Sequence, residues 1–192
     1  MNKIINLAKS ITIFEIVLTA VVAVALGVAF WGWTFVYEIA KPLLKIYGLS
    51  YLSAGFWILA STLLSQIVRK PGVALIASII AAFVESLLTR WGLMSVLWGV
   101  VQGLGAEIIF FIFAYKKWNL KVLMLASMTS AFCSYLLDYF LYDYNGLSLG
   151  MNILQLCSFL ISSAFFAGVL TLKISERLMR LGLLDQFLIA KE

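Results

Sequence analysis

Two carboxylates, Glu85 and Asp138, lie inside long apolar stretches of this sequence and are the side chains best suited to chemistry. An ionisable group within an apolar bundle is costly to bury, so it usually faces the bundle interior or a cavity and has a partner. The sequence offers no lysine or arginine at the same depth, and Arg90, the nearest, lies at the rim. A cationic or amine-rich ligand would supply the missing partner; the alternative is that both carboxylates are structural.

Neutral polar and aromatic side chains are predicted at the level of these carboxylates. At 1.5 Å of rise per residue, Trp98 lies about 9 Å and Gln102 about 15 Å below one end of their helix. Aromatic faces attract cations and stack on flat heterocycles, and Trp57 is an alternative to Trp33 in this role. The sequence therefore predicts one binding site formed by Glu85, Asp138, Gln102, Trp98, Asn152, Tyr142 and Trp33.

Helical spacing groups the two carboxylates with small side chains. Glu85 continues a stripe that contains Ser78 and Ala82, and Asp138 continues a stripe of serines at positions 127, 130 and 134. Residues three or four apart share one face of a helix. Small residues also let helices approach closely, so these stripes have two interpretations, a pocket wall or a packing seam.

The apolar stretches are long enough to cross a membrane as helices. Of the 192 residues, 64 % are hydrophobic and 12 % are charged, and the mean hydropathy is +1.05. A membrane-spanning helix needs about 20 apolar residues, whereas barrel strands are shorter and alternate in polarity. The predicted spans are residues 11–37, 51–68, 73–89, 92–115, 122–142 and 150–172. We therefore predict an all-α polytopic membrane protein in which residues 1–192 form a single six-helix bundle.

The basic residues predict how this bundle is oriented. Only Lys41, Lys45 and Arg90 of the 14 lysines and arginines lie on one side, and the other eleven mark the opposite side. The positive-inside rule makes the more basic side cytoplasmic, so both termini are predicted inside a cell membrane. The basic excess then reflects topology rather than nucleic-acid binding. Glu15 and Glu107 are predicted to form salt bridges with basic residues near the cytoplasmic side.

Several residue types that carry catalysis are missing from the sequence. It has no histidine, which excludes a histidine-based metal site and a Ser-His triad. Cys133 and Cys157 lie within predicted spans without the spacing of a metal or redox motif. It also has no glycine-rich phosphate loop. We predict no catalytic residue, metal or cofactor, and any ATP must be bound by another chain.

The first predicted span carries two sets of small residues. Thr19, Ala23 and Gly27 repeat at every fourth position, and Ala25 and Ala29 form an Ala-x-x-x-Ala pair. Such faces allow close contact with another helix. We expect Ala25 and Ala29 to dock a partner protein, with packing inside the same bundle as the alternative.

The connection after this span, Glu38–Ser50, is the longest predicted loop on its side. Pro42 can begin a short helix and Gly48 can end one. A loop of this kind can fold over the binding site as a lid, and the sequence leaves open whether this one does.

Size, topology and three segments resemble a known transporter family. The small-residue face of the first span and the six-helix plan are similar to substrate-binding S components of energy-coupling factor (ECF) vitamin transporters. The segments 31–37 (WGWTFVY), 83–86 (FVES) and 98–103 (WGVVQG) resemble the YkoE family, an S component for thiamine or hydroxymethylpyrimidine.

The resemblance covers the whole chain and implies capture of thiamine, or its hydroxymethylpyrimidine precursor, from outside. A transmembrane coupling protein and ATP-binding subunits would then drive release into the cytoplasm. A self-contained secondary transporter for a small cationic or amine-bearing solute is the alternative, although no internal repeat with broken helices is visible. A small intramembrane enzyme and a purely structural subunit are further alternatives.

Overall fold

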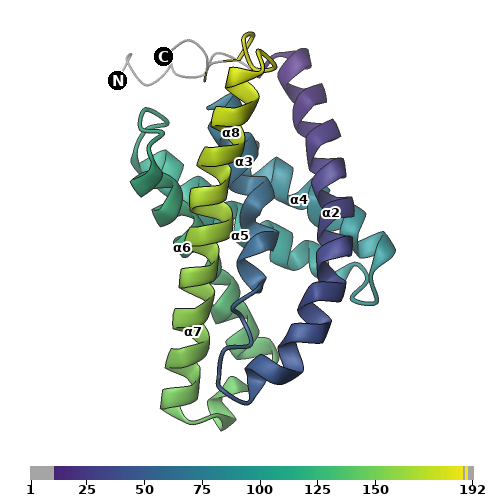
Figure 1. Ribbon diagram of the computed structural model, residues 1–192, viewed down its shortest axis with the longest axis vertical. Helices are drawn as coiled ribbons and strands as arrows, with labels where there is room; N and C mark the ends of the chain where they lie inside the picture. Colours follow the sequence, from purple (N-terminus) through teal and green to yellow (C-terminus); the bar gives the residue numbers. More distant parts are fainter. Residues whose placement is uncertain (1–10, 188, 190–192) are drawn as a thin grey trace.

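The computed structural model describes residues 11–187 and 189, and this part of the chain is helical without strands (Figure 1). Two helical segments combine consecutive elements and four are single helices, apart from one separate three-residue turn of 3-10 helix. The elements are α2 (Ile13–Lys45), η1 (Ala54–Ile58), α3 (Leu59–Val68), α4 (Val73–Leu88), α5 (Met94–Ile112), α6 (Leu120–Leu141), η2 (Tyr144–Gly146), α7 (Leu149–Ser163), the π-helical η3 (Ala164–Val169) and α8 (Leu170–Arg180). Because η1 continues into α3, and α7 through η3 into α8, the described residues form six helical segments.

These six segments confirm the predicted all-α, six-helix fold for the described residues. Four of them are long and apolar enough to cross a membrane, namely Ile13–Lys45, Met94–Ile112, Leu120–Leu141 and Leu149–Arg180. Ala54–Val68 and Val73–Leu88 are apolar but shorter. Lys3, Lys9 and Lys191, which contributed to the predicted topology, lie outside the described residues.

The predicted loop Glu38–Ser50 is wrong for most of its length, because α2 continues through Pro42 to Lys45. A proline inside a helix removes one N–H from the ladder and its ring crowds the carbonyl four residues earlier, yet α2 continues for three residues after Pro42. The turn comes later, where Gly48 has a φ of +71°. Glycine adopts this left-handed conformation without a steric penalty.

The helices pack through small residues on their facing sides. A Cβ atom at Gly27 of α2 would lie 2.6 Å from the carbonyl oxygen of Ala81 in α4. At Gly105 of α5 it would lie 2.7 Å from the Cα of Ser130 in α6, whose hydroxyl donates to the carbonyl of Gln102 at 2.7 Å. Ser130, from the predicted stripe of α6, therefore lies in a packing seam between α5 and α6.

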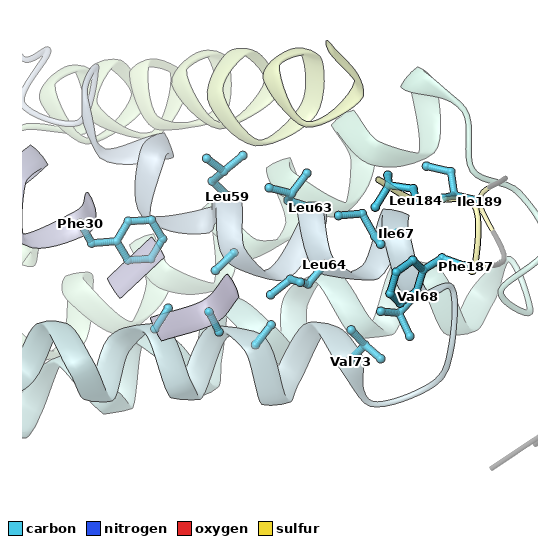
Figure 2. Close-up of a cluster of buried hydrophobic side chains, with 14 residues drawn as sticks. Phe30, Leu59, Leu63, Leu64, Ile67, Val68, Val73, Leu184, Phe187 and Ile189 are labelled. Atoms are coloured by element: carbon cyan, nitrogen blue, oxygen red, sulfur yellow. The ribbon is translucent and has the colours of Figure 1, made fainter. Parts of the chain in front are cut away.

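A buried apolar cluster runs along α3 and continues to Ile189 (Figure 2). Leu63, Leu64 and Ile67 lie along α3, and Leu184 and Phe187 pack beside its last turn (Figure 2). The segment after α8 therefore covers one end of the bundle instead of leaving α3 exposed.

We call this end, where α2 begins and α8 ends, the terminal end, and the other, where α2 ends and α7 begins, the pocket end (Figure 1). At the terminal end, the ammonium of Lys70 pairs with the carboxylate of Glu15, which confirms the salt bridge predicted for Glu15. The salt bridge predicted for Glu107 does not form with any described residue. The carboxylate of Glu107 instead accepts hydrogen bonds from the backbone N–H groups of Gly72 and Ala74, at 2.6 and 3.1 Å, and so caps α4.

Candidate ligand-binding pocket

A cavity of about 680 Å³ opens at the pocket end of the bundle. Its size falls within the range of pockets that hold drug-sized ligands, roughly 300–1,000 Å³. Five of the seven predicted site residues line it: Glu85, Asp138, Gln102, Trp98 and Tyr142. These residues come from α4, α5, α6 and the turn after α6, so segments far apart in sequence meet at one site.

Asp138 is held in the wall by two uncharged donors. The hydroxyl of Tyr51 donates to Oδ2 and the indole N–H of Trp98 donates to Oδ1, both at 2.7 Å. The hydroxyls of Tyr51 and Tyr144 are 3.0 Å apart and form a further hydrogen bond. Burial raises the pKa of Tyr144, so this phenol remains neutral near pH 7. The carboxylate of Asp138 is thus fixed in position, and no described basic residue forms a salt bridge with it.

Unlike Asp138, Glu85 accepts hydrogen bonds on only one of its two carboxylate oxygens. Its side chain comes from α4, where only 3 % of the residue is exposed. The indole N–H of Trp57 donates to Oε1 at 2.6 Å, and the hydroxyl of Thr34 is at 3.5 Å from the same oxygen. Within the described residues, Oε2 has no hydrogen-bond donor. One oxygen of this carboxylate is therefore available to a donor on a bound molecule.

Aromatic rings surround the two carboxylates. Near Glu85, the ring of Trp57 is 5.0 Å from that of Tyr37 and 5.6 Å from that of Trp91. Near Asp138, Trp98 and Tyr142 stack with their ring centres 6.2 Å apart. Flat, electron-rich walls beside carboxylates suit a ligand that is both aromatic and cationic.

Two glutamine amides complete the polar wall. Gln102 is buried, yet its side-chain amide makes no hydrogen bond with the described residues. Gln155 of α7 is 5 % exposed, and its side-chain oxygen is buried without a partner among the described residues. An unsatisfied buried amide costs about 1–3 kcal/mol, and among these two side chains that cost applies to Gln155.

Trp33 and Asn152, which the sequence predicts in the site, do not line the cavity. The indole of Trp33 donates to the carbonyl of Ser53 at 2.8 Å and packs on Phe56, with ring centres 4.6 Å apart. Asn152 donates to the carbonyl of Tyr144 at 3.0 Å. Both side chains point to neighbouring backbone, and Asn152 thereby supports the turn that carries Tyr144.

Several wall residues were not predicted from the sequence. Tyr51 lies in the connection after α2, and its pairing with Asp138 joins positions 87 residues apart. Lys41 and Lys45, from the last turns of α2, also line the cavity. The helical continuation of α2 past Pro42 places these lysines in the wall, whereas the sequence suggested a loop. A helical repeat of Tyr37, Lys41 and Lys45 at every fourth position was the signal that could have revealed them.

The two small-residue sets of α2 separate in the structure. Thr19, Ala23 and Gly27 are buried against the bundle. Ala25 and Ala29 are exposed on its outside. The internal-packing alternative therefore holds for the first set, and the second leaves a face of α2 uncovered by the described residues.

Comparisons with known proteins agree with this architecture. A family model described as "ABC-type cobalt transport system, permease component" matches residues 14–133. The chain is 36 % identical over 187 residues to the curated "Putative HMP/thiamine permease protein YkoE" of Bacillus subtilis (strain 168), where HMP denotes hydroxymethylpyrimidine, covering 96 % of this chain and 92 % of that protein.

A solved structure is similar over almost the same length. It is the "Crystal structure of an S-component of ECF transporter", with 35 % sequence identity and a TM-score of 0.88. The match covers 95 % of this chain and 92 % of that one. The fold, the identity and the coverage on both sides agree, and the chain therefore belongs to the YkoE family of ECF-transporter S components.

Proposed function

We propose that this chain captures thiamine, or its hydroxymethylpyrimidine precursor, as the substrate-binding subunit of an ATP-driven transporter. The observation that carries the proposal is the cavity of about 680 Å³ with two buried carboxylates, Glu85 and Asp138, that only neutral donors contact among the described residues. Buried carboxylates that form no salt bridge favour a ligand that brings a cation. Thiamine combines a cationic thiazolium ring with an aminopyrimidine that carries N–H donors.

In this proposal each carboxylate recognises one ring. Glu85, with its free Oε2, accepts the exocyclic amine of the pyrimidine in a charge-assisted hydrogen bond. Asp138 and the stacked Trp98 and Tyr142 stabilise the thiazolium charge. Gln102 supplies a further neutral hydrogen bond. The relative YkoE carries the name of an HMP/thiamine permease, which supports the same ligand class.

The family model carries a description that names cobalt, but the wall favours an organic ligand. The sequence has no histidine, and residues 11–187 and 189 contain no group of three or more potential metal ligands. First-row transition metals are typically bound by imidazole, thiolate or several carboxylates together. Aromatic rings and amides, which dominate this wall, are groups that bind flat heterocycles.

The pocket end is proposed to face the outside and both termini the cytoplasm of a cell membrane. The excess of basic residues at the terminal end supports this orientation. Ala25 and Ala29, exposed on α2, would contact the transmembrane coupling protein, and separate ATP-binding subunits would supply energy. The absence of a glycine-rich phosphate loop from the sequence supports this division of roles.

Ligand binding by the purified chain alone tests the proposal. In detergent, titration calorimetry should detect saturable binding of thiamine and hydroxymethylpyrimidine without coupling or ATP-binding subunits. In cells, uptake should require those subunits. Failure to bind either compound would overturn the ligand assignment. Uptake driven by a proton or sodium gradient without an ATPase would instead identify a secondary transporter.

A further inference from the structure

Two lysines in the cavity wall have no role in capturing a cationic ligand. Lys41 and Lys45 lie four residues apart on α2 and both line the cavity. Their side chains are exposed, whereas Glu85 and Asp138 are 3 % and 6 % exposed. The cavity thus has two exposed ammonium groups and one exposed carboxylate, Asp143, in addition to the two buried carboxylates.

Neither lysine has its charge neutralised by a salt bridge with the described residues. The ammonium of Lys41 lies 5.1 Å from the centre of the Tyr37 ring and is close enough to Asp138 for the two charges to interact. Arg90, on the same end of the protein, behaves differently. It pairs with Glu38 at 2.8 Å, and neither residue lines the cavity.

The charges in the wall favour a ligand that carries both signs. Asp143 joins Glu85 and Asp138 in the wall, which gives three carboxylates beside the two ammonium groups. A simple anion would be repelled by the carboxylates, and a simple cation would leave the lysines unmatched. A ligand with a cationic ring and an anionic end would match both groups of charges.

We propose that Lys41 and Lys45 form a phosphate subsite, so that the pocket also binds thiamine monophosphate. This inference rests on the proposed function and extends its ligand class to phosphate monoesters. At pH 7 a phosphate monoester carries a charge of about −1.5 to −2, and lysine is a common partner of phosphate.

The buried carboxylates and the exposed lysines of the wall match the two ends of the ligand. Thiamine consists of the aminopyrimidine, the thiazolium ring and a hydroxyethyl arm, in that sequence, and the arm carries the phosphate. In this proposal the buried Glu85 and Asp138 bind the two rings, and the exposed Lys41 and Lys45 bind the phosphate on the arm.

Titration of the purified full-length chain with thiamine and thiamine monophosphate tests this subsite. The measured quantity is the ratio of the two dissociation constants, phosphate ester over thiamine. Wild type should bind both compounds. The double variant Lys41→Gln and Lys45→Gln should raise the ratio at least tenfold. Arg90→Gln, which removes a cation outside the cavity at the same end, should leave the ratio within twofold of wild type.

The outcomes separate the subsite from the proposed function. A ratio that changes less than twofold in the double variant would overturn the subsite while thiamine binding still supports the proposed function. Equal rises in the ratio for the double variant and for Arg90→Gln would also overturn it, since general surface charge would then explain the effect. Failure of the wild type to bind thiamine would overturn the proposed function itself. Saturable thiamine binding by each variant verifies that it is folded.

Discussion

Carboxylates at the two ends of this bundle are stabilised in different ways. At the terminal end, Glu15 accepts from the ammonium of Lys70 and from the backbone and hydroxyl of Thr12. Glu107 accepts from two backbone N–H groups at the start of α4. The chain itself supplies a cation or a helix terminus to each of these side chains.

At the pocket end, the two buried carboxylates that line the cavity, Glu85 and Asp138, accept only from neutral donors among the described residues. Asp138 receives one bond on each oxygen, from Tyr51 and Trp98. Glu85 receives its bonds on one oxygen only. These donors hold the carboxylates in position without neutralising them, which is the arrangement that pre-organises a binding site.

The comparison shows that burial of a charge does not by itself identify a binding site. What distinguishes Glu85 and Asp138 is the nature of their partners and the cavity beside them. The same distinction applies to α2, whose Gly27 face is filled by α4 and whose Ala25 face is not. Substitutions at either end should therefore affect different properties of the protein.

The largest effect on folding is expected from Glu15→Gln. Glutamine keeps the shape of the side chain but cannot form the charged pair with Lys70, and hydrogen bonds to charged groups contribute about 1.5–3 kcal/mol. The free energy of unfolding should fall by about 1–3 kcal/mol, as measured by thermal or chemical unfolding in detergent. Glu176→Gln, the same change at an exposed position of α8, should stay within about 0.5 kcal/mol of wild type. Equal stability of Glu15→Gln and wild type would refute a structural role for the Glu15 pair.

The largest effect on ligand binding is expected from Glu85→Gln. The glutamine amide keeps one acceptor oxygen, but it lacks the negative charge that strengthens the hydrogen bond from the carboxylate to the pyrimidine amine. Thiamine should bind at least tenfold more weakly, a loss of about 1.4 kcal/mol, as measured by titration calorimetry. Glu38→Gln, which removes a carboxylate at the same end but outside the cavity, is the matched control. Unchanged affinity in a folded Glu85→Gln protein would remove this residue from the site.

A smaller and more selective effect is expected from Asp138→Asn. Asparagine can keep both hydrogen bonds, because its oxygen accepts from Trp98 and its amide donates to the Tyr51 hydroxyl, which can also accept. The variant should therefore fold, yet it no longer compensates the thiazolium charge. Wild type should bind hydroxymethylpyrimidine more weakly than thiamine, and the variant should narrow this gap. Equal weakening of both ligands would assign Asp138 a structural role.

The sequence predicts the fold and the most polar part of the site for physical reasons. Long apolar stretches form helices in a membrane because a helix satisfies all of its backbone hydrogen bonds internally. The two carboxylates are noticeable in such stretches because burying a charge is costly. Helical spacing then brings Gln102 and Trp98 to the same side of α5. These predictions depend on local pattern alone.

The sequence fails where the direction of a side chain depends on contacts between helices. Trp33 and Asn152 lie at the expected level but turn toward the backbone of neighbouring segments. Tyr51 is predicted as the first residue of the span 51–68, but it lies in the connection before η1 and enters the wall from there. The sequence does not predict Lys41 and Lys45 in the wall, because Pro42 is expected to start a new helix, whereas α2 continues through this residue.

The smallest effect on the isolated chain is expected from changing Ala25 and Ala29 together to tryptophan. Both side chains are exposed on α2 and neither lines the cavity. The substitution should therefore leave thiamine affinity within about twofold of wild type, well below the tenfold change that corresponds to about 1.4 kcal/mol. A partner helix, in contrast, would be excluded by the two large side chains, because small residues are what permit close approach.

The measurement pairs two readouts on the same variants. Thiamine binding is measured on purified protein, and co-purification with the coupling and ATP-binding subunits is measured together with uptake in cells. The control is the double change Val24→Trp and Val28→Trp. These valines are also exposed and lie one residue earlier, which turns them by about 100° around the helix. Loss of co-purification only when Ala25 and Ala29 are changed would locate the docking face at these two residues. Equal loss when the two valines are changed would contradict that location. Lost thiamine binding or a misfolded alanine variant would mean that this face packs inside the bundle, as Gly27 does against Ala81.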